Sequence, residues 1–162
     1  MKKKRKRSNF IVQGSILAIA SIIVRLIGLV YRIPLTNVIG DEGMGYYSYA
    51  YEPYAVMLLL SYHGLPTAVS KLVAEKNGEG RYRSSYRVFK TGMLLAVVIG
   101  AITGALLWFG ADFIAGALNH QPMSSYALKV LGPTLFILSI MGILRGYFQG
   151  TGTMVPTAVS QI

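Results

Sequence analysis

The stretch from Ser8 to Gly40 constrains the fold of this chain more than any other part of the sequence. It is apolar and rich in Ile, Leu and Val, and its only charged side chains are Arg25 and Arg32. An α-helix rises about 1.5 Å per residue, so about 20 apolar residues span the hydrocarbon core of a bilayer, and this stretch is longer than that. The sequence therefore predicts a first transmembrane helix over residues 10–39.

Small and polar residues form a stripe along this predicted helix. They recur at spacings of four and three residues, which places them on one helical face. The members of the stripe are Gly14, Ala18, Ser21, Arg25, Gly28, Arg32 and Thr36. An arginine in mid-membrane is unfavourable in lipid by roughly 2.5 kcal/mol or more, so it should face a wet cavity or a protein partner. The stripe predicts a helix that lines a cavity.

The composition and the distribution of charge favour an integral membrane protein. The chain has 162 residues, of which 53% are hydrophobic and only 14% are charged. Its net charge of +10 is concentrated, because six of the sixteen Lys and Arg residues lie in 2–7 and six more lie in 71–90. Basic clusters separated by nearly uncharged stretches are the positive-inside pattern of a multi-pass protein, not the pattern of a nucleic-acid-binding surface. We expect a multi-pass protein of the cell membrane in which residues 1–9 form a basic N-terminus in the cytoplasm. We expect no nucleic-acid partner.

Further hydrophobic segments predict an all-α, polytopic transmembrane helix bundle of about four spans plus the start of a fifth. The expected spans are residues 10–39, 44–74, 88–111 and 125–149, and the fifth begins from 154. A short acidic turn at 40–43 separates the first two spans.

Two glycine patterns add detail to these spans. Gly64 and Pro66 interrupt the second span, and we expect a helix break there because proline removes a backbone donor and clashes with the preceding turn. Gly100 and Gly104 form a GxxxG pattern in the third span, which allows two helices to approach closely. We favour contact inside one bundle over dimerisation at this pair. A non-transporting membrane scaffold that associates through these glycines remains an alternative.

No group of residues in the sequence has the pattern of a catalytic or metal site. His63 and His120 are isolated, and the chain has no cysteine. The sequence contains neither a phosphate-binding glycine loop nor a nucleophile beside a base. We therefore expect no enzyme activity, no metal and no cofactor.

Charged side chains inside the predicted spans are the remaining candidates for function. Arg25 lies deepest, and an arginine in a sheltered aqueous cavity binds phosphate with two parallel hydrogen bonds, which points to an anionic, phosphate-bearing ligand. For Arg32 and Glu52, an ion pair near the interface is an alternative to a functional role. Glu52 is also a candidate cation or proton site, which would suit an ion-coupled transporter.

Five short segments are the basis of a resemblance that covers nearly the whole chain. They are residues 25–28 (RLIG), 40–43 (GDEG), 64–71 (GLPTAVSK), 144–150 (LRGYFQG) and 156–158 (PTA). Taken in order, they resemble the polysaccharide biosynthesis and stage V sporulation protein B family. That family is related to the lipid II flippases and to the multidrug and toxin extrusion transporters.

The resemblance implies a bacterial inner-membrane protein with about fourteen helices in two lobes around a central cavity. It implies transport of undecaprenyl-pyrophosphate-linked saccharides to the outer leaflet, with this lipid-linked oligosaccharide and membrane lipids as partners. By matching position, the resemblance assigns pyrophosphate binding to Arg25 and secondarily to Arg32. Residues 10–162 would then be part of an N-terminal membrane lobe, and the remainder of a longer chain is expected. An ion-coupled multidrug exporter is the alternative function.

Overall fold

The computed structural model describes residues 2–59, 64–118 and 122–162, and within these ranges it is almost entirely helical, with no strand. The elements are α1 (Lys2–Leu58), α2 (Gly64–Gly78), α3 (Tyr82–Phe109), α4 (Ala111–Phe113), the π-helical turn η2 (Ile114–Leu118), α5 (Ser124–Thr151) and α6 (Val155–Val159). Three segments are long and apolar enough to cross a membrane, namely Gly14–Leu58, Tyr82–Phe109 and Ser124–Thr151. The predicted all-α membrane helix bundle is confirmed.

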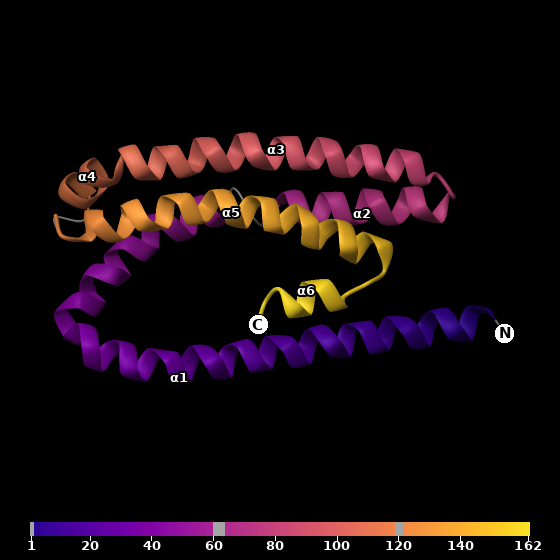
Figure 1. Ribbon diagram of the computed structural model, residues 1–162, viewed down its shortest axis with the longest axis horizontal. Coiled ribbons are helices and arrows are strands. Elements are labelled where there is room, and N and C mark those ends of the chain that lie inside the picture. Colours follow the sequence, from indigo (N-terminus) through magenta and orange to yellow (C-terminus); the bar gives the residue numbers. More distant parts are fainter. Residues whose placement is uncertain (1, 60–63, 119–121) are drawn as a thin grey trace.

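Helix α1 consists of two arms that meet at Gly40. Gly40 has φ 75° and ψ 173°, which are non-helical angles inside an otherwise continuous helix. This region of backbone space is essentially restricted to glycine. The chain reverses there, so the N-terminal arm runs back along the molecule while the second arm leads into the bundle (Figure 1). The turn is shorter than the predicted 40–43, because residues 41–43 are already helical.

The observed helices differ from the predicted spans mainly at their ends. α1 begins at Lys2 and α3 begins at Tyr82, both earlier than predicted, because Lys and Arg are good helix formers and extend a helix beyond its apolar part. The predicted second span is divided between the second arm of α1 and α2. α2 begins at Gly64 and has Pro66 in its first turn, where a missing backbone donor is tolerated. His63 and His120 lie outside the described residues.

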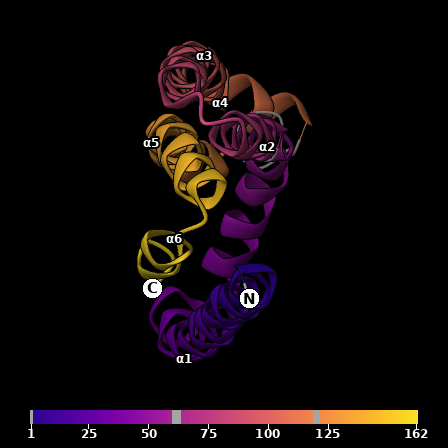
Figure 2. The same ribbon diagram turned by 90° about the vertical axis from the view of Figure 1, so that its right-hand side faces the viewer.

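Helices α2, α3 and α5 pack side by side as the central bundle, and α5 lies against both of the others (Figures 1 and 2). One buried apolar cluster joins the second arm of α1 to α3, α4, η2 and α5, and it contains Ala50, Tyr54, Leu107, Ala111, Ala115, Leu128 and Leu135. A second cluster joins α2, α3 and α5 and contains Val69, Val73, Ala96 and Ile143. The N-terminal arm of α1 stays outside this core, and α6 lies between it and α5 (Figure 1).

Glycines on α5 allow its close approach to α2. A Cβ built on Gly146 would lie 2.5 Å from the Pro66 carbonyl oxygen. A Cβ built on Gly150 would lie 2.6 Å from the Ser70 carbonyl oxygen. The two helices are therefore in backbone contact at these positions, which no larger residue permits without a shift.

The GxxxG pair of α3 is used in the same way against α5. A Cβ on Gly100 would lie 2.9 Å from the Ser139 side chain, and one on Gly104 would lie 2.9 Å from the Gly132 carbonyl oxygen. The prediction that these glycines serve contact inside one bundle is confirmed. Both glycines are buried, so they do not form a free association surface of the kind that the scaffold alternative requires.

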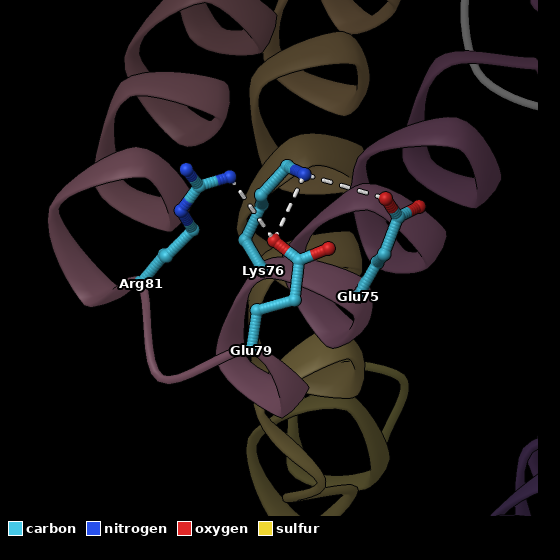
Figure 3. Close-up of polar contacts among 4 residues, drawn as sticks. All are labelled: Glu75, Lys76, Glu79 and Arg81. Atoms are coloured by element: carbon cyan, nitrogen blue, oxygen red, sulfur yellow. Dashed lines mark hydrogen bonds and ion pairs between the residues drawn. The ribbon is translucent and has the colours of Figure 1, made fainter.

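Ion pairs join charged side chains at the connection between α2 and α3 (Figure 3). Lys76 Nζ lies 3.3 Å from Glu75 Oε1 and 3.2 Å from Glu79 Oε2. Arg81 Nη1 lies 3.5 Å from the same Glu79 oxygen. This connection is at the same end of the molecule as the N-terminus (Figure 1). The fold therefore brings the two basic clusters of the sequence to one end of the bundle.

An ion pair links α4 to α5 at the opposite end. Lys129 Nζ lies 2.8 Å and 2.9 Å from the two carboxylate oxygens of Asp112. The hydrogen bond from the Lys129 ammonium lowers the pKa of Asp112. Because the folded pKa is lowered, the pair stabilises the fold above the unfolded pKa of about 3.9, and this stabilisation is lost as the pH falls through the folded pKa.

The substitution Gly150→Ala should destabilise the protein, because its methyl group would overlap the Ser70 carbonyl oxygen and the Val73 side chain. Overpacking of this kind costs about 1–3 kcal/mol, which would appear as a lower melting temperature in detergent. Gly14→Ala is the matched control, because no atom lies within 4 Å of its Cβ position. An unchanged melting temperature for Gly150→Ala would contradict the close contact between α2 and α5.

The substitution Lys129→Met should raise the pKa of Asp112 toward its ordinary value, because it removes the hydrogen bond that lowers it. The titration can be followed by ¹³C NMR of the carboxyl carbon. The difference in melting temperature between the wild type and this variant should be present near pH 6 and should disappear as the pH falls through the lowered pKa of Asp112. Lys90→Met, a change at an exposed residue of α3, is the control and should leave the titration unchanged.

Candidate functional site

Two pockets lie along α1, and each contains one of the predicted arginines. The first pocket, of about 550 Å³, lies between the two arms of α1 near the reversal at Gly40. The second pocket, of about 410 Å³, lies between the N-terminal arm, the C-terminal part of α5 and the residues that follow α6. Figure 2 shows α6 placed between α5 and α1.

The pocket between the arms brings Arg32 and Glu52 to one place. These residues are distant in sequence, and they meet because the chain reverses at Gly40. Both side chains are exposed, and within the described part of the chain neither forms a hydrogen bond or an ion pair. A guanidinium and a carboxylate that share a pocket without pairing offer both donors and acceptors to a bound group.

Tyrosines form the aromatic part of the same pocket. Tyr31, Tyr47 and Tyr51 line it together with the charged pair. The rings of Tyr47 and Tyr51 are stacked, with centroids 6.1 Å apart. Tyr51 also contacts Tyr54, which is buried in the bundle core. The aromatic wall of the pocket is therefore anchored to the core of the protein.

The second pocket contains Arg25 together with Arg145 of α5. Arg25 was predicted from the sequence as a site residue, whereas Arg145 was not. One sequence signal could have identified Arg145: charged residues are rare in this apolar segment, and Arg145 and Lys129 are the only ones in α5. Its partner across the pocket is far away in sequence, so only the folded chain brings the two arginines together.

Arg145 is held in place by the segment that follows α6. Its Nε donates to the Ser160 hydroxyl at 2.8 Å, and its Nη2 donates to the Ser160 carbonyl oxygen at 2.6 Å. The Ser160 hydroxyl in turn donates to the Thr157 carbonyl oxygen at 2.8 Å. Arg25 is exposed and forms no hydrogen bond or ion pair with the residues that the structure describes.

The other predicted positions serve the fold. Gly64 starts α2, and the Pro66 backbone packs against Gly146. Within residues 2–59, 64–118 and 122–162, no three His, Cys, Asp or Glu side chains lie close enough together to hold a metal ion. The arrangement as a whole provides one pocket with two cations and one with a cation, an anion and aromatic rings.

Comparison with known proteins finds relatives that align with nearly the whole of this chain. It is 32% identical over 164 residues to the lipid II flippase MurJ of Bacillus subtilis, a match that covers 96% of this chain and 30% of that protein. It is also 32% identical to the stage V sporulation protein B of the same organism, again over 96% of this chain and 30% of the relative. The chain thus spans 30% of the length of each of these two curated relatives.

A second group of relatives consists of multidrug resistance proteins. The chain is 29% identical over 93 residues to the probable multidrug resistance protein NorM of Listeria monocytogenes, which covers 52% of this chain and 20% of that protein. No solved structure matches the chain. With its long apolar helices and these relatives, the chain is a multi-pass membrane protein. One family model matches residues 11–162, which is nearly the whole chain, and the chain belongs to the polysaccharide biosynthesis protein family.

Proposed function

We propose that this chain acts in a flippase that moves undecaprenyl-pyrophosphate-linked saccharides across the bacterial cytoplasmic membrane, and that it is not an enzyme. The observation that carries the proposal is the match to the lipid II flippase MurJ over 96% of the chain. The position of Arg25 supports it, because this arginine lies in a polar pocket along a helix that is otherwise apolar. A cation in such a place is unfavourable in lipid, so a polar or anionic partner is expected for it.

Arg25 is the proposed first contact of the pyrophosphate. The planar guanidinium matches the geometry of phosphate oxygens and forms paired hydrogen bonds with them, which an ammonium group cannot do. Arg32 is the proposed second contact, about 10 Å further along the same helix. It lies in the pocket between the arms, beside Glu52 and the tyrosines. A headgroup that moves along α1 would meet the two arginines in turn.

The proposed orientation places the N-terminus in the cytoplasm. The N-terminus and the connection between α2 and α3 lie at one end of the molecule (Figure 1), and both are rich in Lys and Arg. The positive-inside rule assigns that end to the cytoplasm. The arm of α1 that carries Arg25 lies outside the buried core, so it can change its angle to the bundle without breaking that core. Rocking of this arm is the proposed means of moving the headgroup.

The substitution Arg25→Ala should abolish complementation in a strain depleted of its lipid-linked-saccharide flippase, because the pyrophosphate loses its first cation. Arg25→Lys should restore complementation only in part, since a lysine keeps the charge and loses the paired hydrogen bonds. Immunoblots should show wild-type amounts of both variants in the membrane. Arg83→Ala, at an exposed position of α3, is the matched control and should complement normally. Full growth with Arg25→Ala would rule out the proposed role.

A second candidate function is ion-coupled export of small molecules. The matches to multidrug resistance proteins support it, although they cover only about half of the chain. Glu52 provides the specific observation, because its carboxylate is exposed in the pocket between the arms and forms no ion pair with Arg32. A carboxylate of this kind is a candidate site for a proton or a small cation.

The substitution Glu52→Gln separates the two functions. If the chain exports small molecules by ion coupling, this variant should lose ion-dependent dye efflux from cells, because the neutral amide cannot exchange a proton or bind a cation in its place. If the chain acts in a flippase, Glu52→Gln should still support cell-wall assembly where Arg25→Ala does not. Dye efflux that depends on Glu52 and not on Arg25 would favour the exporter.

A further inference from the structure

The pocket between α1, α5 and the end of α6 has an unusual distribution of charge. Its described lining contains two guanidinium groups and no carboxylate side chain. The remaining members are Ser21, Val24, Ser160 and Gln161, so hydroxyl and amide groups surround the two cations. Two like charges in one small pocket repel each other, and an anion between them removes that repulsion.

Arg145 is positioned in this pocket partly by Ser160, an uncharged residue. Its two hydrogen bonds to Ser160 have lengths of 2.8 Å and 2.6 Å and go to a hydroxyl and a backbone carbonyl. These hydrogen bonds orient the guanidinium of Arg145, and Ser160 is itself held by its hydrogen bond to the Thr157 carbonyl oxygen. A side chain that is oriented before its ligand arrives loses less conformational entropy when it binds.

We propose that Arg25 and Arg145 together form a two-cation site for a diphosphate group, with one guanidinium on each phosphate. The inference rests on the proposed function and adds a residue of α5 to the binding site. A single phosphate needs only one planar guanidinium for its paired hydrogen bonds. Two guanidiniums from different helices favour a ligand with two phosphates in sequence, and so distinguish a pyrophosphate from a monophosphate.

This site also connects two parts of the molecule. Arg25 belongs to the arm of α1 outside the buried core, whereas Arg145 belongs to α5 at the centre of the bundle (Figure 1). A diphosphate bound to both residues would join the arm to the bundle through charge-assisted hydrogen bonds. Substrate binding is therefore expected to favour the arrangement in which the arm lies close to α5 and α6.

The test measures lipid binding to the protein in nanodiscs, with undecaprenyl pyrophosphate and undecaprenyl phosphate as the two probes. The wild type should bind the pyrophosphate lipid more tightly than the monophosphate lipid. Arg145→Gln should weaken binding of the pyrophosphate lipid by about tenfold or more, the effect of losing a hydrogen-bonded charge, and should leave binding of the monophosphate lipid nearly unchanged. Arg83→Gln, outside the pocket, should bind both lipids as the wild type does.

Two further variants separate ligand binding from a purely structural role of Arg145. Arg145→Lys keeps the charge and should remain folded, and it should lose part of the preference for pyrophosphate. Ser160→Ala removes the hydroxyl acceptor and leaves Arg145 in the pocket, so the preference should persist. If Ser160→Ala loses the preference as fully as Arg145→Gln does, Arg145 acts only by holding α6, and the two-cation site is overturned.

Competition distinguishes recognition of the diphosphate group from recognition of the lipid. Inorganic pyrophosphate should displace undecaprenyl pyrophosphate, and inorganic phosphate at the same concentration should not. Equal displacement by both anions would overturn a site built for two phosphates.

The outcome also separates this inference from the proposed function. In one outcome, Arg25→Gln abolishes the binding of undecaprenyl pyrophosphate while the Arg145 variants bind it as the wild type does. That outcome would remove Arg145 from the site and retain the proposed function. A wild type that shows no saturable binding of the pyrophosphate lipid would overturn both.

Discussion

Gly40 adopts backbone angles that are essentially restricted to glycine, and the positions of Arg25 and Arg32 relative to the charged residues of the other elements depend on it. The reversal at this residue folds α1 back on itself and places Arg32 in one pocket with Glu52. It also directs the N-terminal arm along α6, where Arg25 reaches the pocket that contains Arg145. A straight helix of this length would hold these groups far apart in lipid.

The central bundle provides the fixed surface against which α1 is arranged. Its helices approach closely because the glycines of α3 and α5 have no side chain, so that neighbouring helices come into contact at their backbones. In a membrane, where lipid is as apolar as leucine, such close packing supplies attraction that hydrophobic burial cannot. Most of the large apolar side chains of α1 remain exposed, as expected for a helix that faces lipid or further protein. The molecule therefore consists of a well-packed bundle of α2, α3 and α5 and a more loosely attached N-terminal arm of α1.

Much of the candidate site follows from the sequence, and the rest does not. Arg25 could be selected because a charge inside an apolar span is unfavourable without a function or a partner. Arg145 could not be selected in the same way, since a residue near the end of a span is normally interpreted as an interfacial charge. Its role depends on the hydrogen bonds to Ser160 and on the approach of α1, which are contacts between distant segments.

The sequence by itself determined the class of the protein and the order of its apolar helices. These features are local, because they follow from hydrophobic length, basic clusters and backbone preference. The tertiary structure decided that Arg25 and Arg32 occupy different pockets and that Arg32 meets Glu52 without pairing with it. That division depends on the angle between two helical arms and on the packing of α6, and neither is encoded in the periodicity of any single segment.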